Sequence, residues 1–125
     1  MGALVVPTAM VTSAAAADAA TGCAKSDESR FTYVSLQSTQ VDPVTKACTN
    51  FTVTGVYRGP VTYGHLQLHG SGGHIVNGPA GYFGQGQEGR VTAHNVPSMY
   101  RYCATFWYRD AQGNHHEIDD ECVWQ

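Results

Sequence analysis

The chain has 125 residues, a length typical of one domain, with seven basic and ten acidic residues and a formal net charge of −3 at pH 7. No cluster of Lys or Arg offers the positive surface that a phosphate backbone requires, so we expect no nucleic-acid partner. Four cysteines in so short a chain favour an oxidising compartment and two disulfides, which support a small core.

The chain begins with an uncharged segment, residues 1–17, that passes from an apolar run into small residues. This order matches the apolar and cleavage regions of a secretory signal peptide, although the first basic residue is Lys25. The run is shorter than the roughly 20 apolar residues that span a bilayer. We therefore expect a signal peptide over 1–17, a polar linker over 18–30, and a secreted, extracellular domain over 31–125 with no membrane span.

The rest of the chain consists of short runs rich in Thr, Val, Tyr and Phe, separated by turn signals such as Gly59-Pro60 and Gln112-Gly113. No helical periodicity extends beyond two turns. In chain order, the predicted strands are 31–39, 47–58, 61–69, 74–77, 90–96, 99–109 and 115–124. About seven strands at this spacing predict an all-β domain, either a single antiparallel β-sandwich, which we favour, or a small barrel.

Residues 84–89 read GQGQEG, which fits the GxGxxG pattern of dinucleotide-binding turns. That pattern requires a helix after the last glycine, because the pyrophosphate lies on the helix N-terminus. Here Gly89 is followed by the predicted strand 90–96. We interpret the segment as a Gly-rich connection between strands, and we expect no cofactor.

Three of the six histidines, His65, His69 and His74, lie close together in the sequence and are candidate metal ligands. A hairpin turn at 70–73 places His69 opposite His74, whereas His65 lies roughly 13 Å back along the same strand. A closed zinc site takes four ligands and a catalytic one normally three, so two facing imidazoles predict no metal site. We interpret His69 and His74 as a solvent-facing pair, with Leu66 and Leu68 turned toward the core.

The sequence YRYCA around Cys103, and its spacing from Cys48, resemble the B and F strands of an immunoglobulin domain. The chain also resembles small secreted actinobacterial β-sandwich proteins of the immunoglobulin-like kind. The resemblance implies an immunoglobulin-like sandwich with a Cys48–Cys103 bridge between its sheets. The chain departs from the pattern at Arg101, where the family has Tyr, and it has no Trp on the strand after Cys48.

Side-chain alternation favours another disulfide pairing. Cys48 shares a strand face with polar Thr52, and Cys103 shares one with Arg101, so both cysteines are expected to face away from the core. A hairpin centred on Gln112-Gly113 places Cys103 opposite Cys122, Trp107 opposite Ile118, and Arg101 opposite Trp124. We rank Cys23–Cys48 with Cys103–Cys122 first, Cys48–Cys103 with Cys23–Cys122 second, and Cys23–Cys103 with Cys48–Cys122 last.

The last predicted hairpin, residues 99–124, carries the most distinctive surface. It gathers both tryptophans, two arginines and, within residues 117–121, four carboxylates, a combination typical of protein-binding or sugar-binding faces. The alternative is that the tryptophans cover the core and the acidic residues protect an edge strand from aggregation. The candidate binding residues are Trp107, Tyr108, Arg109, Arg101, Trp124 and Asp119; the Gly-rich region 70–89 is the second candidate.

We therefore expect a secreted, non-catalytic binding module, such as an adaptor subunit of an extracellular, toxin-associated complex, whose partner is another secreted protein or a surface glycan. The alternatives are a lectin-like or inhibitor domain, and a small secreted hydrolase that uses Asp119 and Glu121 as a carboxylate pair. No Ser-His-Asp order, HExxH motif or Cys–His arrangement supports an enzyme.

Overall fold

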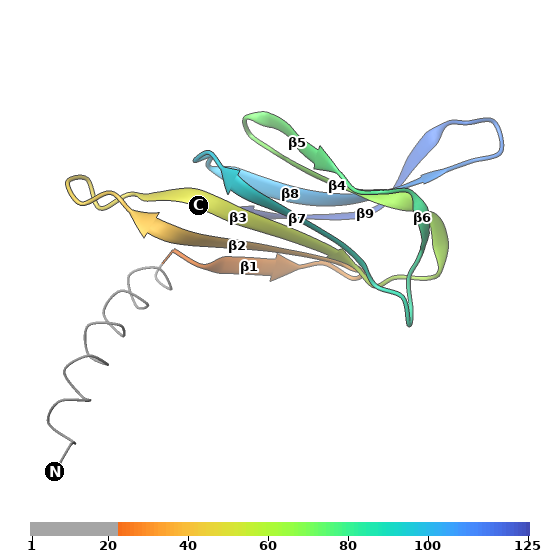
Figure 1. The fold of residues 1–125 in the computed structure, drawn as a ribbon. Helices are drawn as coiled ribbons and strands as arrows, with labels where there is room; N and C mark the ends of the chain where they lie inside the picture. Colours follow the sequence, from red (N-terminus) through yellow and green to blue (C-terminus); the bar gives the residue numbers. More distant parts are fainter. Residues whose placement is uncertain (1–22) are drawn as a thin grey trace, which may run out of the picture.

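The computed structural model describes residues 23–125, so the predicted signal peptide and residues 18–22 of the predicted linker lie outside the described residues. This part of the chain forms two antiparallel β-sheets that lie as two layers (Figure 1). The finding confirms the predicted all-β, two-sheet architecture. In residues 23–125 we find no helix with the length and apolar character needed to cross a membrane.

The first sheet has four strands in the order β1-β2-β3-β7, and the second sheet has the order β5-β4-β8-β9 with β6 paired to β4. The strands of the first sheet are β1 (Lys25–Glu28), β2 (Thr32–Val41), β3 (Cys48–Tyr57) and β7 (Gly89–Val96). Those of the second are β4 (Thr62–Gly70), β5 (Gly73–Asn77), β6 (Gly81–Phe83), β8 (Arg101–Arg109) and β9 (His115–Trp124). The β8–β9 hairpin extends beyond the end of the two layers (Figure 1).

The core lies between the sheets and follows the two-residue alternation of the strands. Every second side chain of the central strands is buried there. Tyr57 of the first sheet stacks on Phe106 of the second, with ring centroids 3.8 Å apart and planes 8° apart. Burial of each large side chain contributes roughly 1.5–3 kcal/mol, so this pair is a main contact between the layers.

Two strands depart from the sequence-based expectation. β1 lies within the predicted linker, and its residues KSDE are exposed. It pairs with β2 through its backbone and has no apolar alternation that would reveal it. β6 is three residues long and lies in the Gly-rich connection, where it pairs with β4. The predicted number of strands, about seven, is therefore too low.

The disulfides are Cys23–Cys48 and Cys103–Cys122, with Cα–Cα distances of 6.1 and 4.0 Å, and no cysteine of residues 23–125 is free. This confirms the preferred pairing and contradicts the Cys48–Cys103 bridge that the immunoglobulin resemblance implies. The first bond ties the segment before β1 to β3, and the second links β8 to β9.

The expectation that both cysteines face away from the core is correct for Cys103 and wrong for Cys48. Cys48 is half-buried and packs against the core cluster, because Asn50 with φ 55° interrupts the alternation of β3. Cys103 does lie on the face opposite to the core, but it is only 1% exposed, because its neighbours on β4 and β9 cover it.

Candidate functional site

One face of the second sheet points away from the core. On β4 and β8, core side chains such as Leu66 and Phe106 point inward, so the residues between them point to the opposite side. His65 of β4 lies directly opposite Trp107 of β8 in the ladder. We call this side the outer face of the second sheet. Its residues on the two central strands are Tyr63, His65, Gln67, His69, Arg101, Cys103, Thr105, Trp107 and Arg109.

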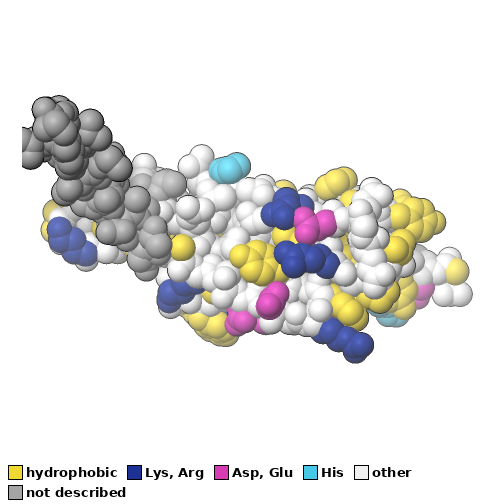
Figure 2. Space-filling model, turned by 90° about the horizontal axis from the view of Figure 1, so that it is seen from below, with side chains coloured by type: hydrophobic (Ala, Val, Ile, Leu, Met, Phe, Trp, Pro, Cys, Tyr) yellow, Lys and Arg dark blue, Asp and Glu magenta, His cyan; other side chains and the backbone are white. Residues whose placement is uncertain are grey.

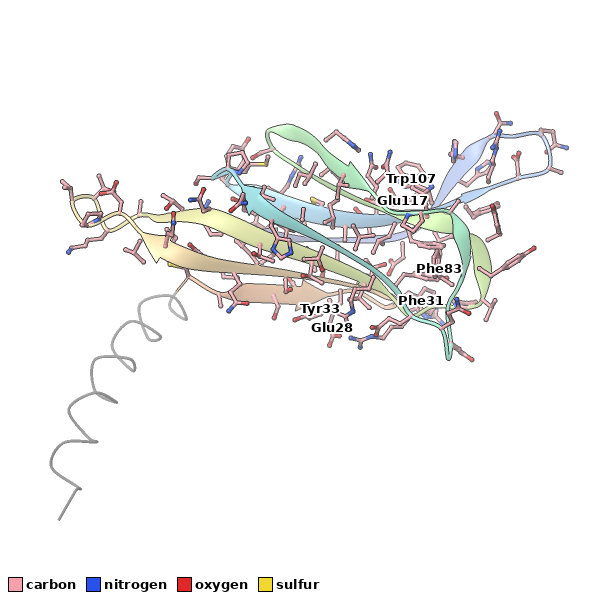
Figure 3. All side chains as sticks on the ribbon, viewed as in Figure 1. Glu28, Phe31, Tyr33, Phe83, Trp107 and Glu117 are labelled. Atoms are coloured by element: carbon pink, nitrogen blue, oxygen red, sulfur yellow. A yellow bond between two sulfur atoms is a disulfide. The ribbon has the colours of Figure 1, made fainter. Side chains whose placement is uncertain are left out.

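The outer face contains a shallow depression of ≈ 380 Å³, which we call the Trp107 depression. It is lined by His65, Gln67, Asn77, Trp107 and His115. The lining therefore comes from β4, β5, β8 and β9, so the whole width of the second sheet contributes. Figure 3 places Trp107 in the upper layer, near the point from which the β8–β9 hairpin extends.

The indole ring of Trp107 is held in place by contacts that run from its side chain through Gln67 to His74. Its Nε1–H donates a hydrogen bond to Gln67 Oε1 at 2.9 Å, and Gln67 Nε2 lies 3.3 Å from His74 Nδ1. The ring is half-buried. Since its only polar group is already paired, what the indole offers to a ligand is its apolar ring surface.

Two imidazoles form the other side of the depression. The rings of His65 and His115 meet edge to face, with centroids 5.7 Å apart and planes 89° apart. Burial, and to a smaller extent the neighbouring His115, lower the pKa of His65, which favours its neutral form. Among residues 23–125, the side chains of His65, His115 and Asn77 have no hydrogen-bond partner, so their donors and acceptors are free for a ligand.

The predicted binding residues separate into groups. Arg109 is exposed and lies near the Trp107 depression, opposite His115. Arg101 and Trp124 lie at the other end of β8, roughly 20 Å away at the usual rise per residue. There the Arg101 guanidinium lies 5.8 Å from the centroid of the Trp124 ring, which is 57% exposed. The predicted Arg101–Trp124 and Cys103–Cys122 registers are confirmed.

Tyr108 and Asp119 do not lie on the outer face. Tyr108 alternates with Trp107 along β8, and its ring stacks on His116 with centroids 5.1 Å apart. Asp119 pairs with core residue Phe106 and points to the edge of the sandwich. The predicted opposition of Trp107 and Ile118 is wrong: a β-bulge makes Ile118 an extra residue, and Trp107 lies opposite Glu117.

The structure does not favour the carboxylate pair considered for a hydrolase. Asp119 Oδ2 accepts hydrogen bonds from Ser29 Oγ and from the Phe31 backbone N–H, so it acts as a structural acceptor. Burial, and then the negative charges of Asp27 and Asp120, raise the pKa of Glu121. Neither Asp119 nor Glu121 lines the Trp107 depression.

The predicted solvent-facing pair of histidines is only half correct. His69 and His74 are opposite each other in the β4–β5 ladder, as predicted. His69, however, is half-buried and its Nε2 lies 2.7 Å from Thr105 Oγ1, because β8 offers a hydroxyl partner on that face. In the part of the chain that the structure describes, no three His, Cys, Asp or Glu side chains converge as a metal site would require.

The GQGQEG segment forms the turn between β6 and β7. Gly84 and Gln87 exchange backbone hydrogen bonds of 2.8 Å, and Gly84 and Gly86 adopt positive φ angles of 141° and 82°. Strand β7 begins at Gly89, where a dinucleotide site would need a helix. This geometry agrees with the interpretation as a Gly-rich connection.

A larger hollow of ≈ 580 Å³ lies at the other end of the sandwich and includes Ser71, Ser98, Tyr100 and Gln125. Three of its polar side chains, those of Ser71, Ser98 and Gln125, are already paired. Ser71 Oγ accepts a hydrogen bond from the Tyr100 backbone N–H at 3.3 Å, and Gln125 Nε2 donates to Ser98 Oγ at 3.1 Å. The hollow therefore offers a ligand fewer free polar groups than the Trp107 depression does.

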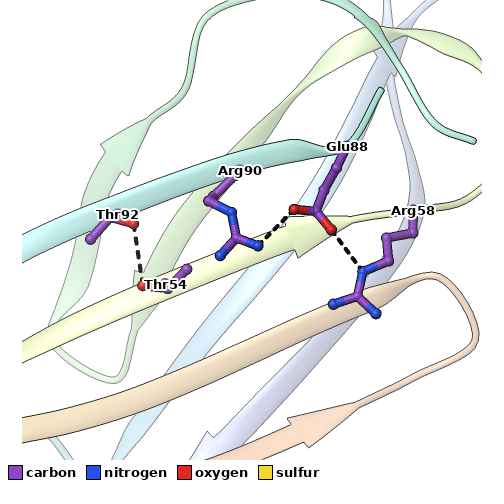
Figure 4. Close-up of polar contacts among 5 residues, drawn as sticks. All are labelled: Thr54, Arg58, Glu88, Arg90 and Thr92. Carbon is purple, nitrogen blue, oxygen red and sulfur yellow. Dashed lines mark hydrogen bonds and ion pairs between the residues drawn. The ribbon is translucent and has the colours of Figure 1, made fainter. Parts of the chain in front are cut away.

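The outer face of the first sheet has a different character. Figure 2, which views the molecule from below, shows basic and acidic groups side by side on this face. Arg58 Nε and Arg90 Nη2 lie 2.9 and 2.6 Å from the two carboxylate oxygens of Glu88, and Thr54 Oγ1 lies 3.2 Å from Thr92 Oγ1 (Figure 4). The hydrogen bond from Arg90 is the main cause that lowers the pKa of Glu88. The two arginines thus form ion pairs with Glu88 in contact with solvent, and exposed ion pairs contribute little to stability.

The sequence patterns singled out Trp107 but not the other residues that line the depression with it. His65, Gln67, Asn77 and His115 were not predicted to join Trp107, because no local pattern shows that β4 pairs with β8. The one sequence feature that pointed toward these residues was the position of His65 and Gln67 on the polar side of an alternating strand.

No family model, curated protein or solved structure matches the chain.

Proposed function

We propose that the chain is a secreted, non-catalytic binding module of the immunoglobulin-like sandwich type, and that the part of the outer face around the Trp107 depression is its recognition surface. The observation that carries the proposal is the Trp107 depression. There, a tryptophan ring fixed by Gln67 lies beside His65, Asn77 and His115, whose polar atoms are unpaired in residues 23–125. A rigid aromatic anchor surrounded by free polar groups favours binding, because little conformational entropy is lost when a ligand is bound.

The lining of the depression supports binding rather than catalysis. It contains no Ser, Cys, Asp or Glu that would act as nucleophile or carboxylate base. The two disulfides support secretion, because such bonds form and persist in oxidising compartments. An adaptor role, with a secreted protein or a surface glycan as the partner, is consistent with a face that spans four strands.

The test is a pull-down with the disulfide-bonded protein from the medium in which it is secreted, followed by affinity measurement on the captured partner. Trp107→Ala should weaken binding by roughly 2 kcal/mol or more. Trp124→Ala is the matched control, because it removes the same kind of ring from β9, opposite Arg101 at the far end of β8. Circular dichroism should show the same strand content in both variants.

Two results would contradict the proposal. Wild-type affinity in Trp107→Ala would place recognition elsewhere, with the Gly-rich connection at 78–89 the next candidate. Equal losses in Trp107→Ala and Trp124→Ala would mean that the depression has no special role. If Trp107→Ala unfolds, Trp107→Phe replaces it, since a phenyl ring preserves much of the packing and removes the hydrogen bond to Gln67.

A further inference from the structure

We infer that the Trp107 depression binds one ring of a neutral oligosaccharide, and that further rings of the same chain extend over Tyr63 and Tyr82. This inference rests on the proposed function and names the ligand class of that site. It follows from three properties of the outer face: the absence of charge in the lining, the mixture of one flat apolar ring with free polar groups, and a second aromatic pair beside the depression.

The first property is the lining's lack of formal charge. An indole, two amides and two imidazoles form the depression, and no Lys, Arg, Asp or Glu side chain belongs to it. Burial and the neighbouring His115 lower the pKa of His65, so this imidazole tends to remain neutral. A charged ligand would therefore lose hydration without gaining an ion pair inside the depression, which disfavours acidic and basic ligands alike.

The second property is the match between the side chains and a sugar ring. A pyranose has an apolar face of C–H groups and a rim of hydroxyls. The surface of the Trp107 ring, with its N–H already bound to Gln67, suits the apolar face. Asn77, His65 and His115 carry the unpaired donors and acceptors that hydroxyls require.

The third property is the continuation of aromatic surface beyond the depression. Tyr63 lies two residues before His65 on the same side of β4, roughly 7 Å away along the strand. Its ring meets that of Tyr82 edge to face, with centroids 5.0 Å apart. The two side chains are 46% and 66% exposed, although both are large and aromatic. A single sugar would need only the depression, so this second pair favours a chain of sugars.

A protein partner fits these observations less well. The residues that dominate binding energy in protein interfaces are enriched in arginine as well as tryptophan. Here Arg109 is outside the lining, and Arg101 lies at the distant end of β8 over Trp124. The lining itself is uncharged, and the charged groups of Glu117 and Arg109 lie only at its margin, opposite Trp107 and His115, whereas hydroxyl groups find partners inside it.

The experiment uses the disulfide-bonded protein on an array of uncharged oligosaccharides of one to six units, containing glucose, mannose, galactose or N-acetylglucosamine. Depletion by insoluble neutral polysaccharides and titration calorimetry of the best ligand follow. We expect affinity to rise with chain length. Trp107→Ala should weaken binding by roughly tenfold or more. Tyr82→Ala should weaken the binding of longer chains and leave the binding of single sugars unchanged.

Trp124→Ala and Tyr100→Ala are matched controls, because their rings stack together at the far end of the sheet, with centroids 6.1 Å apart. Both should bind the oligosaccharide with wild-type affinity. If Trp107→Ala does not fold, Asn77→Ala and His115→Ala at exposed positions test the same lining. Each should reduce affinity several-fold, and wild-type affinity in both would overturn the inference.

The outcomes separate this inference from the proposed function. A protein partner that depends on Trp107, together with no binding of any neutral oligosaccharide, would overturn the ligand class and leave the binding module intact. Binding restricted to acidic glycans would do the same. Neutral oligosaccharide binding that is insensitive to Trp107, Asn77 and His115 would overturn both the ligand site and the proposed recognition surface.

Discussion

Asp119 of β9 receives two hydrogen bonds from the connection between β1 and β2, one from Ser29 Oγ at 2.5 Å and one from the Phe31 backbone N–H at 2.9 Å. The carboxylate thereby joins the edge strand of the second sheet to the first sheet. Figure 3 shows Phe31 in the lower layer, below Trp107 and Glu117. Asp119, a candidate for binding on sequence grounds, therefore closes one side of the sandwich.

We predict that Asp119→Ala destabilises the protein by about 2 kcal/mol, because hydrogen bonds to charged groups contribute roughly 1.5–3 kcal/mol and the Phe31 N–H loses its acceptor. Guanidinium unfolding of the disulfide-bonded protein measures the change. Asp120→Ala, at an exposed neighbouring position, is the control and should change stability by less than roughly 0.5 kcal/mol. Equal effects of the two substitutions would refute the structural role of Asp119.

The same edge contains a pH-sensitive group. Burial, and then the charges of Asp27 and Asp120, raise the pKa of Glu121 above its ordinary value of 4.5. A raised pKa in the folded state means that its contribution to stability is fully present below pH 4.5 and is lost as pH rises through the folded pKa. We therefore predict that Glu121→Gln stabilises the protein more at pH 7 than at pH 4.

Unfolding midpoints of wild type and Glu121→Gln at several pH values between 4 and 7 measure this effect. Glu28→Gln, an exposed carboxylate on β1, controls for the removal of one negative charge. A constant difference between Glu121→Gln and wild type across this range would show that Glu121 titrates alike in the folded and unfolded chains.

Gly64 allows β4 and β8 to approach each other. A Cβ at this position would lie 2.0 Å from the Trp107 carbonyl oxygen and 3.0 Å from the Phe106 ring. Since the closest atom belongs to the backbone, Gly64→Ala should force the strands apart and cost about 1–3 kcal/mol. Gly72→Ala is the matched control, because its Cβ would meet only the flexible Met99 side chain. A wild-type unfolding midpoint in Gly64→Ala would contradict the β4–β8 spacing.

The disulfides give a further prediction. Titration of the unfolded, unreduced protein with a thiol reagent should detect no thiol among Cys23, Cys48, Cys103 and Cys122. Replacement of both Cys103 and Cys122 by Ser should cost about 3 kcal/mol, since their bond closes a loop with a sequence separation of 19. Two reactive thiols per chain would contradict the all-disulfide arrangement.

Local patterns predicted the parts of the structure that depend on neighbouring residues in the chain. The Gln112-Gly113 turn signal and strand alternation gave the correct partners for Cys103 and Arg101. The same reasoning failed four to six residues further along the hairpin, at Trp107. The bulge at Ile118 shifts the register there, and no turn signal or change in composition marks it.

The candidate site was beyond reach of sequence reasoning for a different reason. His115 and Trp107 belong to one hairpin, but His65 and Gln67 come from β4, which is separated from β8 by β5, β6 and β7. Pairing between strands so far apart depends on the packing of the whole core, including the Tyr57–Phe106 stack. The alternation of β4 showed which of its residues point away from the core, but it could not show which residues of other strands lie beside them.

The pairing of β4 with β8 also has a kinetic consequence. The β8–β9 hairpin closes locally, whereas the pairing of His65 with Trp107 closes a long loop that contains β5, β6 and β7. Proteins dominated by such distant pairings fold in roughly milliseconds to seconds, because the entropy of closing long loops opposes each early contact. We expect the Trp107 depression to be among the last features to form during folding. A chain arrested earlier would contain the tryptophan but not the depression around it.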